Sequence, residues 1–253
     1  MRHILAYHAV ADGWEFSAAT VSPRRFREHC AALAEWGWRG VRLDEARLGT
    51  DDCTFGITVD DAYASLVTVI LPECARHGWR GTAFVPTKLV GSDGTWDVGA
   101  WRKHRHLDWS GLREVLAAGW EIGAHGASHR ALTDMPNDAA ERELCDARQE
   151  IEQRLGCAAT SLAYPFGAAS AEVVALAKST GYARAVTMRP GAVAEETDLW
   201  RLPRWPVYRM DRPEHLLVRL GGPRWVYRLE QTRVWTIQQF AQGTRVRMSG
   251  RMR

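Results

Sequence analysis

The chain has 253 residues, of which 46% are hydrophobic, and this is enough for one large domain with a sizeable core. Its formal net charge of +3 is too small to predict nucleic acid as a partner. Five scattered cysteines without a Cys-x-x-Cys pair indicate reduced, mostly buried thiols rather than a disulfide framework. We see neither a signal peptide nor a run of about 18 apolar residues that could cross a membrane, so we expect a cytoplasmic protein.

Segments with the pattern of buried strands alternate with segments typical of amphipathic helices. The predicted strands are residues 4–7, 40–43, 54–59, 81–85, 120–124, 161–164 and 184–187, and residues 199–207 also look extended. The predicted helices lie between Ser22 and Gly37, at 66–77, at 108–118, between Asn137 and Gly156, and between Ser170 and Gly181. Ser22, Asn137 and Ser170 are the predicted N-caps. This alternation predicts an α/β domain with a parallel sheet or barrel.

The C-terminal stretch differs from the rest of the chain. We assign residues 1–220 to the α/β domain and residues 221–253 to a basic extension, which holds seven arginines and one acid, Glu230. Trp225, Val226 and Leu229 could line one side of a helix. We interpret the extension as a loosely docked, partly disordered tail, and weak contact with an anionic surface is the alternative.

Two adjacent carboxylates, Asp60 and Asp61, follow directly after the predicted strand 54–59. Burying two charges there costs hydration energy unless a partner compensates. A bound divalent metal is one explanation, and capping of the next helix is the other. Parallel strands end on one face of a sheet, so His125 and His129, which follow another predicted strand, can approach the carboxylates. Two histidines and one carboxylate suit zinc, and they also suit non-haem iron or another divalent metal.

Adjacent residues of an extended chain point in different directions, so the two carboxylates can have different roles. One can bind the metal, and the other can act as a base toward a water that the metal activates.

Three stretches resemble, in order, the motifs of the polysaccharide deacetylases, which are also called the NodB-homology or carbohydrate esterase family 4 group. Thr58-Val59-Asp60-Asp61 resembles the Thr-Phe-Asp-Asp motif, and residues 121–129 resemble the second, histidine-containing motif. Ala163-Tyr164-Pro165-Phe166-Gly167 resembles the third motif, usually Arg-Pro-Pro-Tyr-Gly. The start, Tyr7-His8-Ala9-Val10, is similar to the branch that de-N-acetylates poly-N-acetylglucosamine. The resemblance spans roughly residues 3 to 210.

This resemblance implies a single-domain, distorted (β/α) barrel and a metal-dependent hydrolase that removes an N-acetyl group from an N-acetylated amino sugar or glycan. Asp60 would be the base. Asp61, His125 and His129 would hold a divalent metal, most simply zinc, and the backbone N–H of Phe166 would help to hold the oxyanion.

The sequence also departs from the family pattern. Ala163 stands where the family has an arginine that orients the base, and the family's late Leu-x-His motif, which supplies the general acid, has no counterpart. Arg204 could restore the positive charge near Asp60, and a surface or ion-pairing arginine is the alternative. His8, at the end of the first predicted strand, is our candidate general acid, and a structural hydrogen-bonding role is the alternative.

Aromatic side chains and the third motif supply the predicted contacts to a carbohydrate substrate, because indole rings stack well on sugar rings. These predicted contacts are Tyr164, Pro165, Gly167, Trp96 and Trp205. Three other functions stay open: hydrolysis of a different non-peptide C–N bond such as a cyclic amide, glycan binding by a catalytically impaired relative, and iron-dependent oxygenation.

Overall fold

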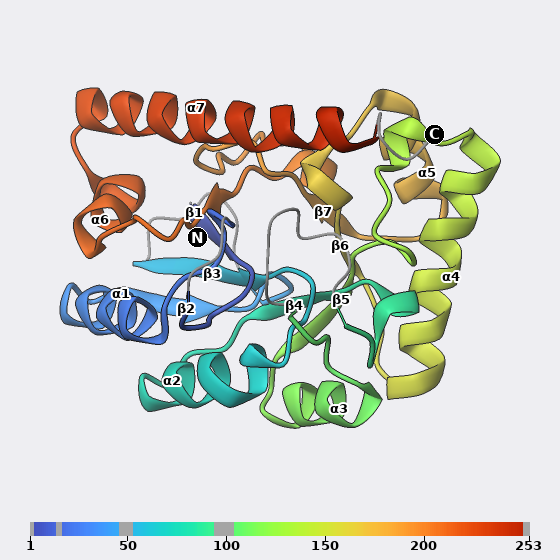
Figure 1. Ribbon diagram of the computed structural model, residues 1–253, viewed down its shortest axis with the longest axis horizontal. Coiled ribbons are helices and arrows are strands. Elements are labelled where there is room, and N and C mark those ends of the chain that lie inside the picture. The colour runs from blue at the N-terminus through green and yellow to red at the C-terminus, as the bar shows by residue number, and fades with distance from the viewer. Residues whose placement is uncertain (1–2, 14–16, 46–52, 94–103, 250–253) are drawn as a thin grey trace.

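A computed structural model describes residues 3–13, 17–45, 53–93 and 104–249 of the chain, and it describes side chains as far as residue 239. Within these residues, eight parallel strands form one curled sheet with helices packed around it (Figure 1). The strands are β1 (His3–Tyr7), β2 (Arg39–Val41), β3 (Thr54–Val59), β4 (Thr82–Val85), β5 (Glu121–Ala124), β6 (Ser161–Ala163), β7 (Arg184–Val186) and β8 (Trp205–Pro206). The α/β prediction is therefore confirmed.

The strands follow the order β7-β6-β5-β4-β3-β1-β8, and β2 also pairs with β3. The two edges of this path are linked by one short segment. Leu202 bridges to Val186 at the end of β7, and Trp205 pairs with Leu5 of β1. This segment therefore completes the curved wall of a distorted barrel, and the C-terminal ends of the strands gather at one opening.

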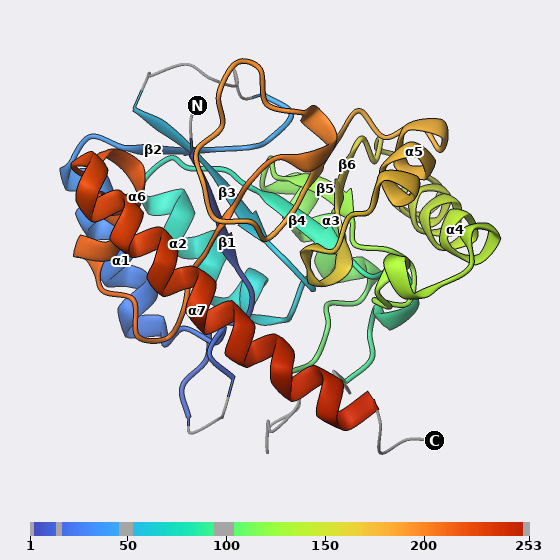
Figure 2. The same ribbon diagram turned by 90° about the horizontal axis from the view of Figure 1, so that it is seen from above.

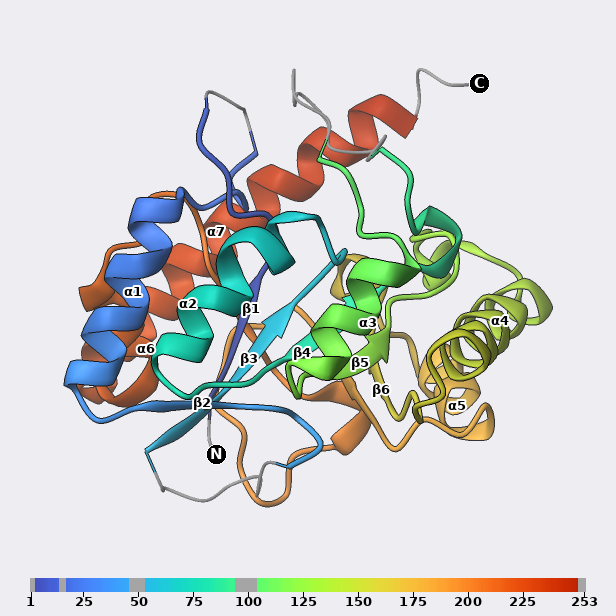
Figure 3. The same ribbon diagram turned by 90° about the horizontal axis from the view of Figure 1, so that it is seen from below.

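In the described part of the chain, seven α-helices cover the sheet. They are α1 (Pro23–Glu35), α2 (Leu71–Arg76), α3 (Trp109–Ala117), α4 (Asn137–Leu155), α5 (Ala171–Ser179), α6 (Pro213–Gly221) and α7 (Arg224–Ser249). Figure 3 shows α1, α2 and α3 side by side on one side of the molecule, and Figure 2 shows α7 crossing the opposite side. None of the described helices combines the length and the apolar composition that a membrane span requires.

Helix starts match the sequence in most places. The hydroxyls of Ser22 and Ser170 accept hydrogen bonds from backbone N–H groups of the first turn, as predicted. The predicted N-cap at Asn137 is wrong, because Pro136 occupies that position and Asn137 is the first residue of the helix. Gly156 ends this helix at φ 68°, a left-handed conformation that glycine adopts without a steric penalty.

Three further predictions need correction. The region 66–77 begins with a π-helical turn, Leu66–Ile70, before α2, and residues 199–207 contain a 3₁₀ turn, Leu199–Arg201, before β8. All five cysteines are free, as predicted, but only Cys30 and Cys74 are buried.

Candidate active site

The two carboxylates diverge because the chain turns sharply after β3. The N–H of Asp60 donates to the carbonyl of Tyr7 at 2.9 Å, which continues the pairing of β3 with β1 by one residue. Asp61 and Ala62 then take left-handed conformations, with φ of 67° and 44°. Residues other than glycine rarely adopt this conformation, and it often marks functional sites. The turn sends the two buried side chains of Asp60 and Asp61 to different partners.

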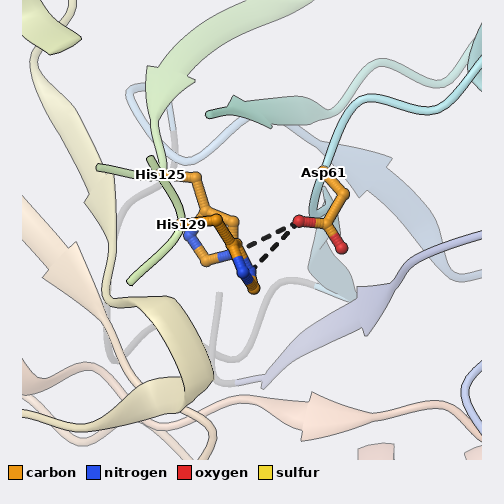
Figure 4. A group of neighbouring side chains, drawn as sticks. All are labelled: Asp61, His125 and His129. Carbon is orange, nitrogen blue, oxygen red and sulfur yellow. Dashed lines mark ion pairs between the residues drawn. The ribbon is translucent and has the colours of Figure 1, made fainter. Parts of the chain in front are cut away.

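The two histidines lie after β5 and face Asp61. Nε2 of His129 is 3.3 Å and Nε2 of His125 is 3.8 Å from Oδ1 of Asp61. Figure 4 shows both imidazoles pointing at this one carboxylate oxygen. Nδ1 of His125 lies 2.7 Å from the carbonyl oxygen of Ala163, which can only accept, so Nδ1 carries the proton. The Nε2 lone pair of His125 is therefore directed at the site.

Burial keeps His125 neutral. Loss of solvent lowers the pKa of this imidazole to about 4, although the nearby Asp60 carboxylate opposes the effect. A neutral imidazole with its proton on Nδ1 is the form that binds a metal through Nε2.

Asp61, His125 and His129 fit a divalent cation. Their three ligand atoms lie within 4.8 Å of one another, and Oδ1 of Asp61 is buried without accepting a hydrogen bond from the described residues. Two atoms held about 2.1 Å from one tetrahedral ion lie about 3.4 Å apart, which is close to the distances of 3.3 and 3.8 Å that separate Oδ1 of Asp61 from the two imidazole nitrogens. Two imidazole nitrogens and one carboxylate oxygen leave positions for water and substrate, as in catalytic zinc sites.

Glu143 of α4 supports the loop that carries the two histidines, and sequence reasoning missed it. Its Oε2 accepts the backbone N–H of Ser128 at 2.7 Å, and Lys88 lies 3.4 Å from its other oxygen. The side chain is buried behind the loop, where His129 has a φ of 58°. One signal was available, because Glu143 falls on the stripe of α4 that otherwise carries small and apolar residues.

Arg204 holds Asp60 from the opposite side of the site. Its Nη1 donates to Oδ1 at 2.6 Å and its Nη2 donates to Oδ2 at 2.8 Å, while Nε donates to the carbonyl of Thr187. The Arg204 side chain is 0% exposed, so it is not a surface arginine. Burial by itself would raise the pKa of Asp60, but the Arg204 guanidinium, together with His125 and His8, outweighs burial and holds that pKa well below its usual range.

His8 lies beside the same carboxylate, at the end of β1. Its Nε2 is 3.9 Å from Oδ2 of Asp60, and Nε2 of His125 is also 3.9 Å from that oxygen. With 23% of its side chain exposed, His8 is the partner of Asp60 that solvent reaches most easily among these residues. Oδ2 is therefore the oxygen of Asp60 that is open to further contacts.

The third motif forms a tight 3₁₀ turn at Pro165–Gly167. Phe166 has φ 60° and ψ 9°, and its ring packs edge-on against His129 with centroids 4.7 Å apart. The turn thus brings the Phe166 side chain against one of the histidines. Pro165 is buried within the turn, and Gly167 is partly exposed.

Two of the side chains predicted to contact a sugar lie elsewhere. Tyr164 is fully buried and donates its hydroxyl to the carbonyl of Trp200 at 3.0 Å. Trp205 is also 0% exposed, and its ring packs against Tyr227. The predicted contacts of both side chains with substrate are wrong, because both fill the core. Trp96 lies outside the described residues.

Comparisons with known proteins agree with this geometry. The sequence profile described as "Polysaccharide deacetylase" matches residues 48–185, a stretch that contains both aspartates, both histidines and the third motif. The YxkH protein of Bacillus subtilis strain 168, a polysaccharide deacetylase by name, is 26% identical over 208 residues, which are 79% of this chain and 69% of that protein.

Solved structures show a similar fold. The deacetylase PplD of Streptococcus pyogenes, in complex with acetate, superimposes with a TM-score of 0.75 at 20% identity, covering 87% of this chain and 99% of that chain. IcaB from Ammonifex degensii superimposes with a TM-score of 0.72 at 19% identity, covering 87% and 95%. The single-domain, distorted (β/α) barrel predicted from the sequence is therefore confirmed.

Proposed function

Because this chain belongs to the polysaccharide deacetylase family, we propose that it is a metal-dependent hydrolase that removes the N-acetyl group from an N-acetylated amino sugar or glycan. The observation that carries the proposal is that a candidate metal site and a buried, ionised carboxylate lie side by side at one opening of the barrel. Asp61, His125 and His129 form a three-ligand set, and the neighbouring Asp60 is fixed in its ionised form by Arg204. A hydrolase of an amide needs both an activated water and a base.

Asp61, His125 and His129 would hold the ion, which we propose to be zinc because two imidazole nitrogens and one carboxylate oxygen are a donor set typical of catalytic zinc sites. When bound, such an ion lowers the pKa of a water and polarises the carbonyl of the amide. Glu143 keeps the histidine loop in the conformation that presents both Nε2 atoms to Asp61. A neutral His125 needs no proton release before it can bind.

Asp60 is the proposed base, acting through Oδ2. Arg204 occupies one lone pair of each carboxylate oxygen, so Oδ2 keeps a second lone pair for the proton of the attacking water. Because the pKa of Asp60 is low, its carboxylate is a weak base toward the proton of the water. For the same reason, the protonated Asp60 gives that proton up readily to the next acceptor. Arg204 therefore acts as a positioning residue for the base, in place of the missing motif arginine.

His8 is the proposed route for that proton to the departing amine. Its Nε2 lies 3.9 Å from Oδ2 of Asp60, a separation that a small movement or one water molecule can bridge. The Phe166 N–H is the proposed donor to the oxyanion, and the left-handed turn at Phe166 and the packing of its ring against His129 support this role. The amide nitrogen must take up a proton before it can leave as a neutral amine. The pair of His8 and Asp60 would supply this proton in place of the family's late histidine, the general acid.

Metal content and acetate release test this proposal together. We expect about one equivalent of zinc per chain in the wild type and none in His125→Ala, with His215→Ala on α6, outside the three-ligand set, as the control. Asp60→Asn should keep the metal and lose acetate release from N-acetylated chito-oligosaccharides by about 10²–10⁴-fold. Full activity of Asp60→Asn would rule out Asp60 as the base, and a chain that binds no added zinc would rule out the mechanism.

A cytoplasmic location stays a prediction, and the free state of all five cysteines supports it. Cell fractionation with an antibody to the native protein would test it.

A further inference from the structure

Helix α7 exposes large apolar side chains on a single face. Trp225, Leu229 and Trp235 are 69%, 62% and 56% exposed, and they make up half of the large hydrophobic side chains that the described part of the chain exposes. At about 100° per residue they fall on one side of the helix. Trp225 and Leu229 of the predicted stripe therefore lie on this exposed face, whereas Val226 is only partly exposed.

The orientation of this helix is fixed by buried charges on its inner side. Glu230 and Arg233 of α7 meet Asp211 and Arg219 of the domain in one network, in which Asp211 and Arg219 are 0% exposed. Val234 is also fully buried. Removing one member of such a network leaves an uncompensated buried charge, so rotation of the helix is strongly disfavoured. The expectation of a loosely docked tail is wrong for this part of the chain.

Positive charges accompany the apolar side chains. Arg224 and Arg228 are exposed on the same side as Trp225, Leu229 and Trp235, and these five residues form what we call the outward face. The one acid in residues 221–253 is Glu230, which the inner network buries. The outward face therefore combines indole rings, an aliphatic side chain and guanidinium groups, with no acid among its members.

We propose that the outward face of α7 binds the surface of a membrane that contains anionic phospholipids. Tryptophan prefers the headgroup level of a bilayer, and arginine pairs with lipid phosphates while its aliphatic stem stays in the apolar layer. Figures 1 and 2 show α7 lying lengthwise along the outside of the molecule, an orientation that lets a rigid helix rest in the plane of the interface. Charge complementarity selects anionic lipid over a second copy, because a symmetric dimer through this face would bring like charges together.

Co-sedimentation of the full chain with phosphatidylcholine vesicles, with and without phosphatidylglycerol, tests the proposal. We expect binding only with phosphatidylglycerol, and weaker binding at high salt. Arg224→Gln/Arg228→Gln should lower the partition coefficient about 30-fold at low salt. The matched control is Arg24→Gln/Arg27→Gln on α1, which changes the net charge equally and should not have this effect. Trp225→Ala should also weaken binding, whereas Trp36→Ala should not.

Three results would overturn the proposal: no binding of the wild type to phosphatidylglycerol vesicles, equal loss of binding in the α1 control, or a dimer that Trp225→Ala converts to a monomer. The last would show that a second copy covers this face. These measurements follow binding and not acetate release, so they do not depend on the proposed function. Circular dichroism of each variant checks that α7 stays folded.

Discussion

Replacing Arg204 with methionine removes the guanidinium that pairs with Asp60 and keeps a side chain of similar length. Arg204 is fully buried and contacts both carboxylate oxygens, at 2.6 and 2.8 Å. Breaking a buried ion pair from one side costs about 3–5 kcal/mol, because the remaining charge loses its partner without regaining water. For a chain of this size, we expect the melting temperature to fall by about 6–20 °C.

A double variant separates the ion pair from the packing of the arginine. In Asp60→Asn/Arg204→Met no charge is left unpaired, so we expect the free energy of unfolding to recover by about 1–3 kcal/mol relative to Arg204→Met alone. Urea unfolding of wild type, both single variants and the double variant, all in the presence of a chelator, gives the four values of the cycle. The chelator removes the contribution of bound metal to stability.

Additive effects in this cycle would refute the reasoning, because they would show that Arg204 and Asp60 do not stabilise each other. Arg204→Lys supplies a second check. Lysine keeps the charge but cannot make two parallel hydrogen bonds to a carboxylate, so its stability and its acetate release should both lie between those of wild type and Arg204→Met.

Other predictions follow from the loop, the core and the sheet. Glu143→Leu should weaken zinc binding about 10–100-fold, measured by competition with a chromophoric chelator, and Glu141→Leu on the exposed side of the same helix should not. Burial lowers the pKa of His29 from 6.5 to about 4, so the unfolded chain binds the proton first and stability is lost as pH falls from about 6.5 toward 4, by up to about 3 kcal/mol. Urea unfolding at several pH values should show a flatter profile for His29→Asn, and an unchanged profile would contradict this. Gly123→Ala would place a Cβ 2.6 Å from the ring of Phe84, so we expect the free energy of unfolding, measured by thermal unfolding, to fall by about 1–3 kcal/mol and the zinc content to fall as well. Unchanged stability and zinc content would contradict this.

Strand positions and the three proposed metal ligands were accessible to sequence reasoning because each depends on local chemistry. The strand 54–59 has the same bounds in prediction and structure, since its β-branched residues end at two charges. His125 and His129 follow a strand, and parallel strands end on one face, so their approach to Asp61 needed no knowledge of packing.

Contacts that depend on tertiary packing could not be predicted from the sequence. Trp205 looked like a sugar-binding ring, but its exposure is decided by Tyr227 and Arg219, which come from a later part of the chain. The docking of α7 was missed because Glu230 and Arg233 form a buried network only when Asp211 and Arg219 are brought beside them. Residue type alone predicts exposure for such charges, and tertiary contacts overrule it.

The position of Arg204 shows why a departure from a motif need not remove the positive charge beside Asp60. Ala163, which stands where the family resemblance leads one to expect arginine, is fully buried among apolar side chains such as Phe84 and Leu202. Asp60 offers one negative charge, and Arg204 already covers both of its oxygens. A second arginine at 163 would be a buried cation without an anion, so a small apolar residue there is what a cation at 204 requires. The missing motif arginine therefore does not favour a catalytically impaired relative, because a positive charge beside Asp60, the proposed base, is present and comes from the segment that precedes β8.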